Sequence, residues 1–169
     1  MKALKKYSGL LIIAAMVACI SPSFAQDKRE VKEIEKEAQV KKWLDTRKYT
    51  FKPTSMHPAR YGYGNNWTMT SDYSLDVRTD TVSSYLPFFG RAYTAVMGGD
   101  DQGIKFVSSN VDYTAKESKK NRWDITIKPK NSQSVSSMIL RVFANGEASL
   151  SVNSNNRESI SFQGYITGK

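Results

Sequence analysis

The fold class follows from residues 140–152, which read LRVFANGEASLSV. Apolar and polar residues alternate on both sides of Asn145-Gly146, and this period of two is typical of a β-strand with one buried face. An Asn-Gly pair between two such runs predicts a tight hairpin with a type I′ turn, in which both central residues have positive φ. The stretch therefore predicts two adjacent antiparallel strands.

Short strands separated by turns extend outward from this hairpin. The same alternation places Trp123, Ile125 and Ile127 on one face, and it recurs over residues 72–86 around a tight turn at Thr79-Asp80. Consecutive strands of this kind favour an antiparallel meander, and closure into a barrel removes exposed sheet edges. The predicted fold class is all-β: a curled antiparallel meander or barrel of about eight strands, lipocalin-like in outline.

The predicted barrel domain covers residues 49–169. Its first strand begins at residues 49–51, and Pro53 is expected to end the regular pairing because proline has no N–H to donate. Residues 55–71, rich in Gly, Asn, Pro and Tyr, are predicted to form a loop.

A charged segment, residues 26–48, precedes the barrel domain and predicts one helix. It is rich in Glu, Lys and Ala and contains no Gly or Pro. At helical spacing, Val31 and Ile34 fall on one side, whereas Trp43 and Leu44 fall on nearly the opposite side. We therefore expect the C-terminal half to dock through Trp43 and Leu44, while the first half is either loosely held or a spacer.

Residues 1–25 have the features of a bacterial-type secretory signal. Three lysines precede an apolar run, and Ser-Phe-Ala, ending at Ala25, supplies the pattern for cleavage. Met16–Cys19 loosely resembles a lipobox, so lipidation of Cys19 is the alternative to cleavage after Ala25. Both interpretations predict an exported protein that is periplasmic, associated with the outer membrane or secreted, with no transmembrane span in the mature chain.

Composition argues against several function classes. The chain has 25 basic and 16 acidic residues, with no basic run, which together with export argues against nucleic acid as a partner. The single cysteine lies in the signal and His57 is the single histidine, which disfavours thiol chemistry and His-rich metal sites. We therefore predict no cofactor, no metal site and no catalytic residues, and hence a protein that is not an enzyme.

Three blocks of the sequence resemble a known family. They read SYLPFFGRAY at residues 84–93, GGDDQGIKF at residues 98–106 and SNNRESISFQG at residues 154–164. Through these blocks, residues 44–167 are similar to the domain of unknown function 4251 family of exported Bacteroidota proteins. The resemblance implies a β-rich domain and an envelope or secreted location. It implies no activity, so no catalytic residue can be carried over.

The first block also carries the main candidate site. Pro87 and Gly90 predict a bend that presents aromatic rings and one cation at fixed places, as at the mouth of a ligand pocket. The alternative is that the rings fill one end of the barrel and the Arg hydrogen-bonds loop carbonyls. The candidate ligand-binding residues are Tyr85, Phe88, Phe89, Arg91 and Tyr93.

Two further surface sites are predicted at turns. Asn156 and Arg157 form a candidate polar rim for the ligand, and the alternative is an Asx turn in which Arg157 ties the last strand to a neighbour. Asp80-Thr81-Val82 fits an acidic-hydroxyl-aliphatic pattern of bacterial O-glycosylation, which makes Thr81 a candidate glycosylation site; the alternative is an ordinary turn.

The leading functional hypothesis is binding of a small or glycan-like ligand in the cell envelope, with the bend at residues 85–93 at the mouth of a cavity. The alternative is a structural or assembly protein with a filled barrel, which engages another envelope protein through its helix or a sheet edge. The two hypotheses predict different interiors, a cavity lined by the rings of the bend or a solid core.

Overall fold

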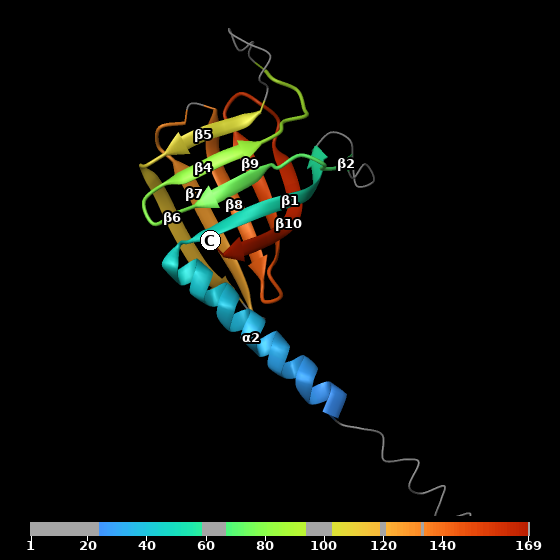
Figure 1. Cartoon of the computed structure of the whole chain (residues 1–169). Helices are drawn as coiled ribbons and strands as arrows, with labels where there is room; N and C mark the ends of the chain where they lie inside the picture. The colour runs from blue at the N-terminus through green and yellow to red at the C-terminus, as the bar shows by residue number, and fades with distance from the viewer. Residues whose placement is uncertain (1–23, 59–66, 94–102, 119–120, 133, 169) are drawn as a thin grey trace, which may run out of the picture. The chain divides into compact units, whose positions relative to one another are not determined.

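The computed structural model describes residues 24–58, 67–93, 103–118, 121–132 and 134–168 (Figure 1). The chain divides into two units, Met1–Ile34 and Glu35–Lys169. Cys19 with almost all of the predicted signal, Asn66 of the predicted loop and most of the Gly-rich block at residues 98–106 lie outside the described residues.

One helix and ten strands make up the described secondary structure. They are α2 (Phe24–Thr46), β1 (Tyr49–Pro58), β2 (Trp67–Thr68), β3 (Ser74–Val77), β4 (Val82–Leu86), β5 (Ile104–Ser108), β6 (Val111–Ser118), β7 (Arg122–Pro129), β8 (Val135–Phe143), β9 (Glu147–Ser154) and β10 (Ile160–Gly168).

The strands form one antiparallel sheet that curls into a nearly closed barrel, which confirms the predicted fold class. The strand order is β5-β4-β3-β1-β10-β9-β8-β7-β6, with β2 paired to β1 alone. The first and last strands pair with each other in the middle of this order, so the sheet is a meander joined through its two ends (Figure 1). The described strands leave one gap, between β5 and β6, which we call the seam.

Apolar side chains fill the interior of the barrel. The alternation predicted around residues 72–86 is confirmed, because Leu75, Val77 and Val82 are buried while Asp76 and Ser83 are only partly covered. Large rings and aliphatic chains from the remaining strands meet them in one continuous core. The largest fully buried side chains in the barrel strands include Tyr49, Phe51, Phe162, Ile125, Ile127, Met138, Leu140 and Leu150.

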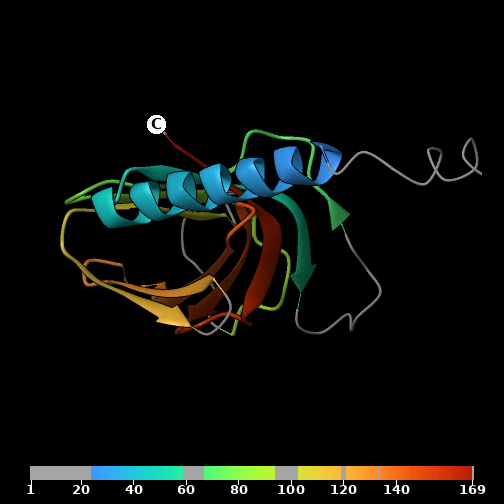
Figure 2. The ribbon, with the colours of Figure 1, turned by 90° about the horizontal axis from the view of Figure 1, so that it is seen from below.

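The C-terminal half of α2 packs against the barrel, as predicted. Leu44 is buried in the core, and a Cβ added to Gly168 of β10 would overlap the indole of Trp43. Asn121, in the turn before β7, donates from Nδ2 to Glu37 Oε2 at 2.9 Å. The helix ends where Arg47 adopts a positive φ of 50° and Lys48 N donates to Trp43 O. Figure 2 shows the curled sheet and the helix from below.

The first strand is longer than predicted. Pro53 interrupts its register but does not end it, because a bulge between Pro53 and Ser55 absorbs the missing donor and pairing with β10 resumes through Pro58. Gly164 lies opposite the bulge, where an added Cβ would overlap the Lys52 carbonyl oxygen. Residues 55–58 are therefore strand rather than loop, and His57 lies opposite Ser161.

The Asn-Gly hairpin forms, but its turn is not type I′. Among the described residues only Gly146 of this loop has positive φ, at 85°. Gly146 N donates to Phe143 O at 2.9 Å, which closes a turn that includes Ala144, and Asn145 Oδ1 accepts from Glu147 N. The loop therefore has three residues, a type I turn followed by a left-handed glycine, because Ala144 enters it.

Candidate functional site

The aromatic bend begins where β4 leaves the sheet. Leu86 is the last paired residue of β4, and Pro87, which has no N–H, follows it. Phe88 turns inward and is 6% exposed at the margin of the core. A Cβ added to Gly90 would lie 2.9 Å from Phe88 Cζ, so glycine is needed for the chain to pass this close to the ring.

The structure brings together two sequence blocks that were predicted as separate candidate sites. The bend meets the turn between β9 and β10 through an isolated bridge between Ala92 and Arg157. Tyr93 N donates to Asn156 O at 2.8 Å, and Glu158 N donates to Arg91 O at 3.0 Å. These backbone bonds hold the bend and the turn as one rigid surface at one end of β4.

Side chains reinforce this junction. The guanidinium carbon of Arg157 lies 5.1 Å from the centre of the Phe88 ring, in a cation–π contact. Glu158 Oε2 accepts from Arg91 N at 3.3 Å. Arg157 thus has the tying role that its alternative interpretation predicted, while it also contributes a cation to the surface.

The other rings of the bend point outward. Tyr85, Phe89 and Tyr93 are 46%, 47% and 66% exposed. Phe89 makes an edge-to-face contact with Trp67 of β2, whose ring centre is 5.0 Å away. Of the predicted ligand residues only Phe88 reaches the core, so the rings do not line an interior cavity as the leading hypothesis predicted. In the described structure the bend instead offers an outer surface, which we call the aromatic rim: Trp67, Phe89, Arg91, Tyr93, Arg157 and Glu158.

Sequence reasoning missed Trp67 and Glu158. Trp67 lies in a segment predicted as loop, and β2 places it against Met56 of β1. Glu158 comes directly after the predicted polar pair, but only its backbone and side-chain bonds to the Arg91 backbone show that it belongs to the site. No local pattern in the sequence indicates this contact, because Glu158 Oε2 accepts from the backbone N–H of Arg91.

Tyr85 belongs to a separate surface group. Its ring lies 5.4 Å from that of Tyr73, and Lys105 Nζ lies 4.8 Å from its centre. Because Tyr85 projects from β4 before the bend begins, it flanks the aromatic rim instead of joining it.

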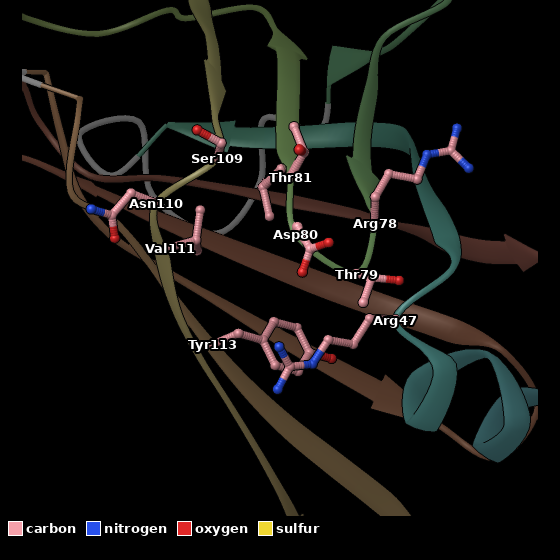
Figure 3. Close-up of a pocket in the computed structure, with 10 residues that line it drawn as sticks. Arg47, Arg78, Thr79, Asp80, Thr81, Ser109, Asn110, Val111 and Tyr113 are labelled. Carbon is pink, nitrogen blue, oxygen red and sulfur yellow. The ribbon is translucent and has the colours of Figure 1, made fainter.

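Thr81 lies at the other end of β4. Arg78 N donates to Thr81 O at 2.8 Å, which closes the tight turn predicted at Thr79-Asp80. Thr81 is half-buried and lines a pocket of about 200 Å³ at the seam (Figure 3). We call it the seam pocket. Nothing in this geometry bears on glycosylation of Thr81, which stays a prediction.

Tyr113 lines the seam pocket, and the buried Tyr49 lies behind it. The hydroxyl oxygens of Tyr49 and Tyr113 are 3.2 Å apart, and the guanidinium carbon of Arg47 lies 4.5 Å from the centre of the Tyr113 ring. Burial, followed by the neighbouring Tyr113, raises the pKa of Tyr49 well above its usual value, and burial also raises the pKa of Tyr113. Both hydroxyls are therefore neutral at physiological pH.

The described residues contain no candidate metal centre. No group of three or more His, Cys, Asp or Glu side chains in this part of the chain could hold a metal ion. His57 is half-buried in β1, and its Nε2 atom has no hydrogen-bond partner. None of the described helices is long and apolar enough to cross a membrane.

Comparisons with known proteins give a family and a fold. Residues 31–166 match the family model described as "Domain of unknown function (DUF4251)". A solved structure of a DUF4251 family protein from Bacteroides eggerthii superposes with a TM-score of 0.57 at 13% sequence identity, covering 79% of this chain and 87% of that chain. No curated protein matches the sequence.

Proposed function

The chain belongs to the DUF4251 family, a domain family of unknown function, and from its geometry we propose that it binds a glycan-like ligand in the cell envelope without catalysing a reaction. The bridge between Ala92 and Arg157 carries this proposal. It joins exposed rings and charged groups, far apart in sequence, on one rigid surface.

Sugars suit this combination of groups. Their C–H faces are apolar and stack on aromatic rings, while their hydroxyls donate to carboxylates and accept from guanidinium groups. On the aromatic rim, Phe89 and Tyr93 supply exposed rings, and Arg91 and Glu158 supply charged groups beside them. The rim is an outer surface, so the ligand binds across the barrel end.

The envelope location rests on the sequence. Residues 1–25 have the pattern of a secretory signal, so the working form of the protein is residues 26–169, with the charged helix at residues 26–48 and the barrel at residues 49–169. Lipidation of Cys19 is the alternative mode of export. The intact mass of protein purified from its host distinguishes these forms.

A glycan array tests the ligand proposal. We expect binding that falls at least about tenfold in Phe89→Ala and Tyr93→Ala, since each removes a stacking surface. Phe143→Ala is the matched control, because Phe143 is also exposed, at 40%, but lies on β8 away from the rim. Equal binding by all of these variants would contradict the proposal. Native mass spectrometry of host-purified protein gives an independent view of retained ligand.

Two observations favour the alternative, a structural or assembly role. The interior is filled, and β5 is an edge strand on which Val107 is 72% exposed. An exposed apolar edge can add a strand from a partner. Under this alternative, Val107→Lys abolishes crosslinks between this protein and other envelope proteins. Under the glycan proposal, Val107→Lys leaves the crosslinking pattern unchanged.

A further inference from the structure

The seam pocket is a second candidate binding site, at the opposite end of β4 from the aromatic rim. The β3–β4 turn, the β5–β6 turn and the residue that ends α2 all contribute to it. Its lining is dominated by hydroxyl, amide and charged side chains (Figure 3), among them Arg47, Asp80, Thr81, Ser109, Asn110 and Tyr113. A volume of about 200 Å³ admits a ligand of several non-hydrogen atoms.

Two cations, Arg47 and Arg78, and one anion, Asp80, line the pocket, and Arg47 and Asp80 do not pair with each other. Within the described structure, no ion pair joins Arg47 to a carboxylate or Asp80 to a cation at 4.0 Å or less. Arg78, which also lines the pocket, differs, because its guanidinium lies 3.9 Å from Asp76. Figure 3 shows Asp80 on the hairpin turn and Arg47 with Tyr113 across from it.

Arg47 is held in place before any ligand arrives. Its backbone adopts the left-handed conformation that ends α2, and its guanidinium lies on the Tyr113 ring. The Tyr113 hydroxyl in turn contacts that of Tyr49, which is fully buried. A guanidinium held in this way loses little conformational entropy on binding an anion.

The two charges limit the class of ligand. A simple anion would be attracted to Arg47 but repelled by Asp80, and a simple cation would meet the opposite problem. A ligand with an ammonium and a carboxylate group satisfies both, and the side chains of Thr81, Ser109 and Asn110 offer further hydrogen bonds. We propose that the seam pocket binds a small zwitterion, a free α-amino acid.

Three related probes of different charge test the proposal. The purified protein is titrated with L-alanine, N-acetyl-L-alanine, which is an anion, and L-alaninamide, which is a cation, while amide chemical shifts of Asp80, Ser109 and Asn110 are followed. We expect L-alanine to bind and each singly charged analogue to bind at least about tenfold more weakly. Equal affinity for all three probes, or no shifts at millimolar L-alanine, would overturn the proposal.

Charge variants make the test specific. Asp80→Asn should reduce the preference for L-alanine over N-acetyl-L-alanine at least about tenfold, while Arg47→Asn should abolish binding of both. Asparagine suits both positions, because it tolerates turns and positive φ. Lys130→Gln is the control, since Lys130 pairs with Asp112 outside the pocket. A preference unchanged in Asp80→Asn, in protein that unfolds like the wild type, would also overturn the proposal.

Discussion

The two ends of β4 differ in how they are built. At the C-terminal end, the aromatic rim takes Phe89, Arg91 and Tyr93 from the bend and adds Trp67 from β2 and the turn after β9. At the N-terminal end, the seam pocket takes its charged side chains from the end of α2 and from the β3–β4 turn, and completes its lining from β6. The bend can be recognised in the sequence because its residues are neighbours, whereas the seam pocket, assembled from distant turns, exists only once the sheet has curled.

Both ends depend on the same core, so the largest effect should come from damaging it. Phe162 of β10 is fully buried, and Phe162→Ala should lower the free energy of unfolding by about 3–5 kcal/mol through the lost burial and the cavity left behind. Chemical denaturation measures this loss. The exposed Phe143→Ala should cost far less, within about 1 kcal/mol. Equal losses would mean that the interior is not packed as described.

Alkaline pH should reduce the stability of the protein through the tyrosine pair beside the seam pocket. The folded-state pKa of Tyr49 is raised above its unfolded value, mainly by burial, so the stability tied to its neutral hydroxyl is fully present below the unfolded pKa, about 10, and is lost as pH rises beyond it. Tyr49→Phe should lose about 1 kcal/mol at neutral pH with the hydrogen bond to Tyr113, and should resist alkali better than the wild type.

Denaturation curves at several pH values above neutral test this expectation. The exposed Tyr165→Phe serves as the control and should keep the wild-type profile. If the free energy of unfolding of Tyr49→Phe fell with rising pH just as it does for the wild type, the tyrosine pair would not contribute to the pH dependence of stability.

At the rim, Arg157→Met should have a smaller effect. It removes the cation from the Phe88 ring but retains an apolar stem of similar length, so the expected loss is about 0.5–1 kcal/mol in the free energy of unfolding. Thermal unfolding at matched ionic strength measures it. Arg157→Lys keeps the charge and should recover part of the loss. No difference between the two variants would argue against a cation–π contribution.

The smallest effect is expected beside the seam, on the outer surface. Lys130 Nζ lies 2.8 Å from Asp112 Oδ1, but the two side chains are 52% and 60% exposed. Solvent and salt screen such a pair, so Asp112→Asn should change the free energy of unfolding by less than about 0.5 kcal/mol. A larger loss, measured by thermal unfolding at low salt, would show that this pair supports the β5–β6 corner.

Much of the fold could be predicted because a strand with one buried face alternates apolar and polar residues with a period of two. The alternation at Leu75 and Val77 and at Trp123, Ile125 and Ile127 reports directly which face of each strand is buried. Leu44 and Trp43 likewise identified the docked face of the helix. These are short-range patterns, and the structure confirms each of them.

The remaining features depend on partners that are distant in sequence. Pro53 by itself predicts the end of a strand, because proline has no N–H to donate. The residue that makes room for the bulge and lets the strand continue is Gly164, which lies far away in the sequence on β10. Asn145-Gly146 alone predicts a type I′ turn, but Ala144 also joins the loop. The seam pocket was not predicted at all, since nothing near Arg47 or Tyr113 in the sequence indicates that they meet.

The pairing of β1 with β10 also sets the order in which the chain can fold. The ribosome makes β10 after every other described strand, yet its place is in the middle of the sheet, between β1 and β9. Tyr49 must wait for Gly168 before that ladder can close. Until translation reaches β10, a nascent chain therefore carries two groups of strands, β1–β5 and β6–β9, that are not yet paired with each other. Removal of β10 would split the sheet at its centre, whereas removal of an edge strand would only shorten it.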